Sequence, residues 1–128
     1  MINGAHFLIY STNADLDRMF IKDVLGFKSV DVGRGWLIFK APPSEMAVHP
    51  LDANDDFGQM HAEQRMLGVV LYLMCPDVHA EVKALEAKGV MCSKITDAGW
   101  GITTSIKLPS GGHIGLYQPK HALAYELP

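Results

Sequence analysis

The sequence carries the same helix pattern twice, once in each half of the chain, and this repeat limits the possible folds more than any other feature. Residues 13–25 and 77–88 each begin with a side chain that suits a helix N-cap and continue with apolar residues about one turn apart. A glycine follows each helix, Gly26 or Gly89, and suits the left-handed conformation just past a helix end. We therefore expect two halves of similar structure.

Short β-like segments surround both predicted helices, with turn residues between them. One segment precedes each helix and three follow it: residues 5–10, 28–31, 36–40 and 45–49 in the first half, and 68–74, 90–94, 102–107 and 113–118 in the second. Trp36 and Trp100 stand at matching places in the two halves, which supports the alignment of the repeats. This order of elements predicts an α+β protein built from tandem βαβββ units.

The repeat also sets the expected organisation of the chain, which is a single domain over residues 1–128. Its parts are a first unit at about residues 1–51, a linker at 52–66, a second unit at 67–120 and a C-terminal tail at 121–128. The linker is long for a connection between units, and we expect a short helix over residues 59–65 within it.

Composition and charge exclude several classes of protein. With 48% hydrophobic and 20% charged residues the chain is ordinary for a globular protein. No apolar run approaches the roughly 20 residues that span a bilayer. A net charge of -3 with scattered basic residues argues against nucleic acid or a membrane as a partner. The N-terminus lacks a signal-peptide pattern, so a cytoplasmic location is expected. Cys75 and Cys92 are expected to be reduced thiols.

Three short motifs resemble those of a known superfamily. They are Asp23-Val24-Leu25-Gly26-Phe27 at the first helix exit, Trp100-Gly101 before a strand, and Pro109-Ser110-Gly111-Gly112 before the last strand. Their order and spacing resemble the vicinal oxygen chelate superfamily of glyoxalases, bleomycin-resistance proteins and extradiol dioxygenases, in particular its small glyoxalase-like bacterial members. The resemblance implies eight strands in a curved mixed sheet around a cleft, with the helices outside. It also implies a homodimer, because small members often build clefts across two chains.

The same resemblance implies that the usual metal site of the superfamily is absent. In members with a metal, each half supplies one ligand from its first strand and one from its last. The matching positions in this sequence are His6, Ala47, Val70 and Gly115, and of these only His6 has a donor side chain. We therefore expect no cofactor, and a protein that binds a small organic molecule in its cleft, as bleomycin-resistance-like relatives do. Whether it is also an enzyme stays open.

A displaced metal site is the alternative. Glu45 and His113 lie two residues before the vacated positions, so strand alternation turns both toward the cleft. With His6 they form a two-histidine, one-carboxylate set that suits one divalent ion such as Fe, Mn, Zn or Ni. The chain would then be a metal-dependent lyase or isomerase of the glyoxalase type, or a ring-cleaving dioxygenase. Backbone hydrogen bonding or solvation at strand starts explains the same three side chains without a metal.

Strand alternation also predicts which side chains line the cleft and bind the ligand. They are His6, Leu8, Tyr10, His49, Tyr72, Met74, Thr103, Ser105 and Tyr117. Aromatic, apolar and hydroxyl groups of this kind suit a small, partly aromatic ligand held by stacking and a few hydrogen bonds. The alternative for Tyr10, Tyr72 and Met74 is that they fill the core. His121, in the tail, is expected to face water.

Overall fold

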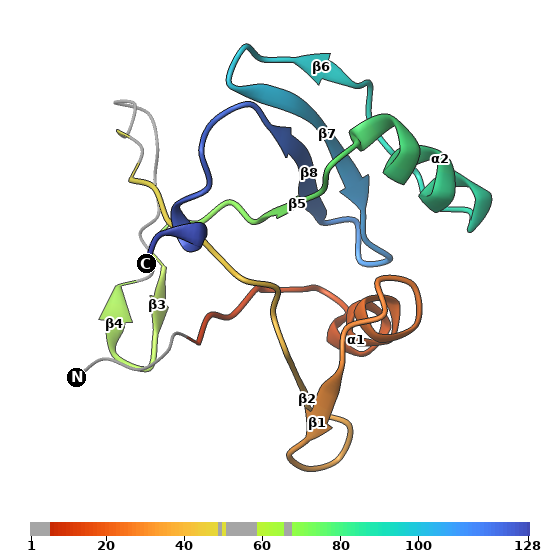
Figure 1. The fold of residues 1–128 in the computed structure, drawn as a ribbon. Helices are drawn as coiled ribbons and strands as arrows, with labels where there is room; N and C mark the ends of the chain where they lie inside the picture. Colours follow the sequence, from red (N-terminus) through yellow and green to blue (C-terminus); the bar gives the residue numbers. More distant parts are fainter. Residues whose placement is uncertain (1–5, 49, 51–58, 66–67) are drawn as a thin grey trace.

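The computed structural model describes residues 6–48, 50, 59–65 and 68–128 of the chain. Figure 1 shows two α-helices and a set of short strands in this part, joined by long open segments. The α+β class predicted from the sequence is confirmed. Within the described residues no helix is both long and apolar enough to cross a membrane.

Both predicted helices form, because each has the cap that its sequence predicts. α1 (Ala14–Asp23) begins after Asn13, whose Oδ1 accepts a backbone N–H three residues further on at 3.3 Å. α2 (Val78–Ala87) begins after Asp77, whose Oδ1 accepts the equivalent N–H at 3.1 Å. The glycines that follow the two helices have φ angles of 74° and 80°, in the region where side chains are rarely tolerated, so glycine ends both helices.

The largest sheet comes from the second half of the chain and has the strand order β5–β8–β7–β6. Its strands are β5 (Tyr72–Met74), β6 (Thr96–Asp97), β7 (Gly101–Lys107) and β8 (His113–Pro119). β5 pairs in parallel with β8, whereas the β8–β7 and β7–β6 pairs are antiparallel. β7 and β8 pair along their whole length because a short turn connects them directly.

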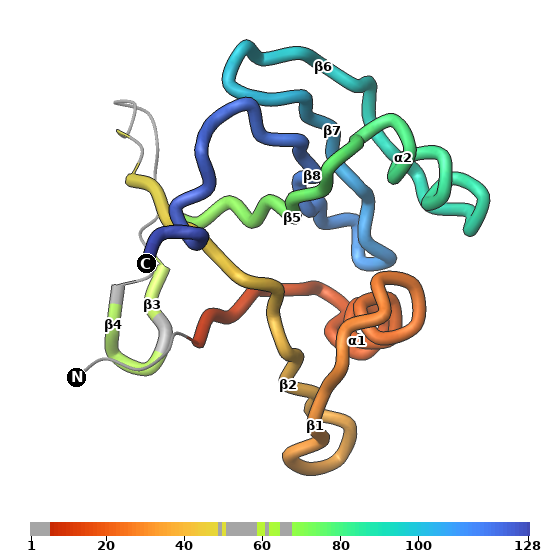
Figure 2. Tube along the Cα trace, viewed as in Figure 1, coloured from red at the N-terminus to blue at the C-terminus, as the bar shows by residue number. Residues whose placement is uncertain are grey.

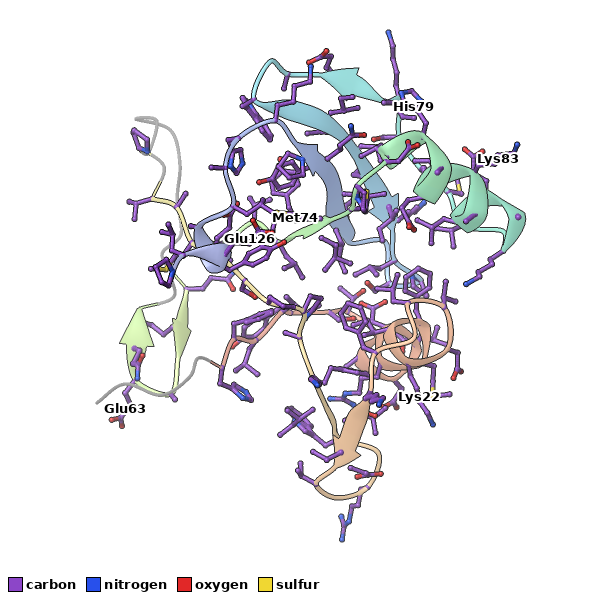
Figure 3. The ribbon with its side chains drawn as sticks, in the orientation of Figure 1. Lys22, Glu63, Met74, His79, Lys83 and Glu126 are labelled. Atoms are coloured by element: carbon purple, nitrogen blue, oxygen red, sulfur yellow. The ribbon has the colours of Figure 1, made fainter. Side chains whose placement is uncertain are left out.

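The core lies between α2 and one face of this sheet. Val78 and Val82 belong to the inner stripe of α2, and Ile106 and Leu116 meet them from β7 and β8. Figure 3 shows Lys83 on the outer side of α2, away from the sheet. Because side chains alternate along a strand, the residues between the buried ones on β7 and β8 face away from α2. The sheet therefore has a second face that α2 does not cover.

In the first half, β1 (Ser29–Asp31) and β2 (Leu37–Phe39) form an antiparallel hairpin, as the sequence predicts. The turn between them is held by the Asp31 carboxylate, which accepts the backbone N–H of Gly33 at 2.8 Å and of Gly35 at 3.2 Å. This hairpin is a separate sheet and does not join the β5–β8–β7–β6 sheet.

The helix predicted over residues 59–65 is wrong. These residues form a second hairpin, β3 (Met60–His61) with β4 (Gln64–Arg65). The two residues between the strands, Ala62 and Glu63, have φ angles of 47° and 66°. A right-handed helix needs negative φ at every residue, whereas a tight two-residue hairpin turn needs positive φ at both central positions. The backbone at Ala62 and Glu63 therefore ends any helix there.

The strands predicted at residues 5–10 and 45–49 do not form in the described residues 6–10 and 45–48. Figure 2 shows these stretches as open chain, the first leading to α1 and the second following β2. The reason is that a strand exists only when a neighbouring backbone supplies ladder partners, and no described segment does so here. Met46 and Val48 consequently remain 92% and 91% exposed.

The eight-stranded curved sheet is accordingly not seen in the described part of the chain, where the strands fall into three separate sheets. Two strands predicted in the second half are also reduced. Residues 90–94 contribute one isolated bridge, Cys92 with Ile106, and β5 starts at Tyr72 rather than at residue 68. In the described residues the β–α–β–β–β order is therefore seen in the second unit alone, whereas the first unit shows α1, β1 and β2.

The two halves are joined by hydrogen bonds between α1 and the β7–β8 turn. Asp17 of α1 is only 3% exposed, and its carboxylate accepts the backbone N–H of Ser110 at 3.1 Å and the Ser110 hydroxyl at 2.7 Å. Thr12 adds a third contact by donating its hydroxyl to the Ser110 carbonyl at 3.1 Å. These bonds satisfy a buried carboxylate and fix α1 against the second half.

Candidate ligand pocket

A pocket of about 270 Å³ lies on the face of the sheet that α2 leaves uncovered. Its lining comes from residues before β5, from the segment between α2 and β6, and from β5 to β8. The lining residues are Val70, Tyr72, Ser93, Lys94, Thr96, Thr103, Thr104, Ser105, His113 and Gly115. Thr103 and Ser105 alternate with the buried Thr104 and Ile106, so their side chains point away from the core. The pocket is therefore a direct result of strand alternation.

Several predicted cleft residues lie in this pocket. Tyr72, Thr103 and Ser105 line it together, and His113, predicted as an alternative metal ligand, lines it as well. The strands that carry these residues are adjacent, since Ser105 of β7 pairs with Gly115 of β8, and Gly115 pairs with Tyr72 of β5.

Other predicted cleft residues lie outside the pocket. Leu8 and Tyr10 are exposed on residues 6–10, as is His6, because that segment does not pair with the sheet. Met74, labelled in Figure 3, lies further along β5 and is half-buried. Tyr117 is buried on β8 beside the pocket, and His49 lies outside the described residues.

Three of the pocket residues that the sequence did not predict lie after α2, two on an irregular segment and one at the start of the short strand β6. Ser93, Lys94 and Thr96 follow α2 and run beside β7. The segment is fixed at Ser93, whose N–H donates to the Ser105 carbonyl at 2.9 Å and whose hydroxyl accepts the Ser105 N–H at 2.8 Å. A run of hydroxyl residues opposite a predicted strand is the signal that could have identified them.

Two glycines allow a cluster of aromatic rings to form beside the pocket. A Cβ at Gly115 would collide with the Tyr72 ring, and a Cβ at Gly101 would lie 2.9 Å from the Tyr117 ring. Trp100 completes the cluster, with its ring centroid 6.3 Å from that of Tyr72 and 5.5 Å from that of Tyr117, in edge-to-face arrangements. The Tyr72 ring thus lies on the backbone of Gly115, and the Tyr117 ring lies on the backbone of Gly101.

A polar network continues from the aromatic cluster into the C-terminal segment. The Tyr117 hydroxyl lies 3.3 Å from Glu45 Oε1 and 2.9 Å from His121 Nε2. His121 Nδ1 donates to the Ala122 carbonyl at 2.9 Å. The His121 side chain is 42% exposed, so it faces water as expected and also makes these two contacts. Glu45 Oε2 accepts the Ala124 N–H at 2.8 Å, at the start of the short 3-10 helix η1 (Ala124–Glu126). Glu45 therefore anchors the C-terminal segment.

Tyr117 is the centre of this network, because its hydroxyl contacts both other side chains, Glu45 and His121. Its single hydroxyl proton has two acceptors within reach, the carboxylate and the imidazole. Burial raises the pKa of Tyr117, and the nearby negative charge of Glu45 raises it further. The hydroxyl is thus held in its neutral form, in which it can donate to either neighbour.

The predicted metal ligands are not brought together. Among the residues that the structure describes, no group of three or more His, Cys, Asp or Glu side chains is close enough to hold a metal ion. Glu45 is committed to Tyr117 and Ala124, while His113 lines the pocket. At three of the positions where the resemblance places metal ligands, the side chains of Val70, Ala47 and Gly115 carry no donor atoms. These residues do not fit the usual metal of the superfamily.

A second hollow, of about 290 Å³, lies between α1 and the β1–β2 hairpin. Its polar side chains are largely paired with their own neighbours. Arg18 bonds Asp15 at 3.0 Å, and Asp31 holds the hairpin turn. This hollow contains none of the predicted cleft residues, so the sheet pocket is the better candidate site.

Comparisons with known proteins agree with this fold. No family model matches the sequence, and neither does any curated protein. Solved structures do match. TnmS3, an antibiotic-binding protein from Streptomyces sp. CB03234, has a TM-score of 0.61 and 20% identity over 94% of this chain and 100% of its own. A lactoylglutathione lyase from Agrobacterium tumefaciens has a TM-score of 0.57 and 19% identity, covering 86% and 88%.

A third match is itself described as a member of the glyoxalase/bleomycin resistance protein/dioxygenase superfamily, from Sphaerobacter thermophilus DSM 20745, with a TM-score of 0.54 and 19% identity over 87% of this chain and 91% of that one. The chain has the fold of this superfamily. Identities near one in five establish the glyoxalase fold alone. Within that fold, Val70 and Gly115 both line the pocket, so the pocket occupies the place where the resemblance puts metal ligands.

Proposed function

We propose that the protein binds a small, partly aromatic organic molecule in the pocket over β5, β8 and β7, without the usual superfamily metal. The observation that carries this proposal is the pocket itself. It has an aromatic wall at Tyr72 and hydroxyls at Thr103 and Ser105, where Val70 and Gly115 replace metal donors. A ring can stack on Tyr72, and the hydroxyls can fix its orientation. That TnmS3, an antibiotic-binding protein, has the same fold supports this proposal.

The size of the pocket limits the ligand. Pockets for drug-sized ligands usually measure about 300–1,000 Å³. At about 270 Å³ this pocket accepts one or two rings from a single chain. A larger ligand needs further walls, which a second chain can supply.

We also propose that the protein functions as a homodimer. Val69 and Val70, immediately before β5, are 73% and 75% exposed, and Met46 and Val48 are more exposed still. Monomeric proteins seldom leave several large apolar side chains in water unless they form a contact surface. Light scattering across a dilution series should give a mass near twice the 14.0 kDa of the chain. A constant single-chain mass at micromolar concentration would contradict the dimer.

Trp100 provides a direct test of binding, because its ring lies beside Tyr72 at the pocket. In a Trp36→Phe background Trp100 is the sole tryptophan, since the chain has two. We expect aromatic antibiotics or simple aromatic compounds from a panel to change its fluorescence saturably. Ser105→Leu, which fills the pocket, should abolish the response, and Ser44→Leu, at an exposed position that does not line the pocket, should not.

The same titration separates the binding protein from the metal enzyme. Binding should be unchanged in the presence of a metal chelator. A ligand that binds only with a divalent ion, or that is converted to product, would favour the metal-dependent alternative instead. Equal responses in Ser105→Leu and Ser44→Leu would show that the ligand binds elsewhere.

A further inference from the structure

The pocket lining has basic side chains and no carboxylate. The chain has a net charge of -3, yet the pocket lining contains Lys94 and His113 and no Asp or Glu. Lys107 adds a third basic group, because it pairs with His113 across β7 and β8 and directly opposed residues share a face of the sheet. This face of an acidic protein is therefore locally basic.

These basic side chains have no partners in the described part of the chain. Lys94, Lys107 and His113 make no side-chain hydrogen bond or ion pair with other described residues, whereas nearby carboxylates are already engaged. Asp97, next to Thr96, accepts from Lys120 at 2.7 Å and from a backbone N–H at 2.9 Å. The basic groups are thus available to a ligand.

The hydroxyls at the pocket supply further donors. Thr104 donates its hydroxyl to the Ser93 carbonyl at 2.7 Å, so in the 3.1 Å pair between Thr104 and Ser93 the Ser93 hydroxyl is the donor. Both protons are therefore used within the protein. The hydroxyls of Ser105 and Thr96 have no protein acceptor among the described residues. Together with Lys94 they form a set of donors that can bind an acceptor on a ligand.

We infer that the ligand carries an oxyanion, such as a carboxylate on an aromatic ring, which Lys94 and His113 bind while the ring packs against Tyr72. This inference rests on the proposed function and specifies its ligand class. An oxyanion accepts several hydrogen bonds at once, and charge-assisted bonds are the stronger kind. A neutral ligand can accept hydrogen bonds from the hydroxyls, but it offers Lys94 no opposite charge.

The test compares aromatic acids with their methyl esters. Benzene and naphthalene carboxylic acids and the corresponding esters are titrated against the Trp36→Phe protein by Trp100 fluorescence. The ester keeps the ring and removes the charge. We expect the acid to bind about tenfold more tightly than its ester, and this preference to weaken as salt screens the charges.

Variants assign the preference to its residues. Lys94→Met keeps an unbranched chain without the charge and should remove most of the acid preference while ester binding persists; His113→Gln should reduce it further. Lys83→Met, on the outer side of α2, is the matched control and should behave as wild type. Ester binding by the variants shows that they are folded.

Each outcome bears on one claim. Acids and esters that bind equally well would overturn the inference and leave the proposed binding function standing, and so would binding of neutral compounds alone. An acid preference that survives in Lys94→Met with His113→Gln would also overturn it. Failure of every compound in the broader panel of aromatic ligands would overturn the proposed function as well.

Discussion

Asp17 and Ser110 lie 93 positions apart in the sequence and are joined by two hydrogen bonds, at 2.7 and 3.1 Å. Because the Asp17 carboxylate is buried, both donors of Ser110 are needed to offset its desolvation. The bonds hold the turn between β7 and β8 against α1. That turn contains one of the motifs that relate the chain to the glyoxalase fold, and the contact gives the motif a structural role.

Replacing Asp17 should therefore destabilise the whole domain. Asp17→Ala leaves the Ser110 N–H and hydroxyl without their acceptor, and we expect a loss of about 2–3 kcal/mol in the free energy of unfolding. Urea denaturation measures the effect. The control is Asp15→Ala, which removes a salt bridge whose carboxylate is 88% exposed and should change stability by less than about 1 kcal/mol. Similar losses in both variants would mean that the buried contact contributes little.

Gly115 should not tolerate a side chain while Tyr72 is present. Gly115→Ala places a Cβ against the Tyr72 ring, and we expect a loss of about 1–3 kcal/mol and altered Trp100 fluorescence as the ring moves. Gly112→Ala is the control, because its Cβ would have no neighbour closer than 3.6 Å. In the Tyr72→Ala background the cost of Gly115→Ala should nearly vanish. Additive losses would show that the ring is not the obstacle.

We predict that ionisation of the Tyr117 hydroxyl lowers the stability of the fold at alkaline pH. Its pKa is raised in the folded protein, by burial first and then by Glu45. Folding thus favours the neutral phenol, so its contribution is complete below the ordinary tyrosine pKa of about 10 and is lost as the pH rises through the raised value. Unfolding free energies at a series of alkaline pH values should fall less steeply for Tyr117→Phe than for wild type. Identical slopes would contradict this assignment.

The two cysteines should react slowly in the native protein. Burial raises the pKa of Cys75 and of Cys92, and neighbouring glutamates add to both shifts. Because the thiolate is the reactive form, alkylation near neutral pH should be about tenfold slower than in the urea-unfolded chain. Mass spectrometry of Cys75→Ser and Cys92→Ser assigns each rate. Native and unfolded chains that react at the same rate would exclude protection of the thiols.

Local signals account for what could be predicted of the fold. The helices carry their own N-caps and terminating glycines, and β7 and β8 are joined by a short turn, so each of these elements is specified within a few residues. The strands predicted at residues 5–10 and 45–49 depend on partners from distant segments, which alternation alone does not identify. For the same reason the sequence predicted the helix at residues 59–65 in place of a hairpin whose turn requires positive φ.

The candidate site likewise contains residues that the sequence predicts and residues that it does not. Thr103 and Ser105 follow from alternation along a regular strand. Lys94 lies on an irregular segment and Thr96 begins a strand of two residues, so neither belongs to a run of alternating residues from which its orientation can be predicted. His121 is exposed as the sequence predicts, but its contacts with Tyr117 and the Ala122 carbonyl could not be predicted, because they form only once the tail folds back.

The Tyr72 ring over Gly115 also restricts how this chain can change by mutation. A carboxylate introduced at position 115 would have to displace the ring, and it would find no donor side chain at Val70 or Ala47 with which to share a metal. A carboxylate at position 115 alone therefore carries a steric cost and creates no metal site. The order of substitutions matters, because a smaller residue must replace Tyr72 before a larger residue can replace Gly115. The aromatic wall thus makes the residue that position 115 accepts depend on the residue at position 72.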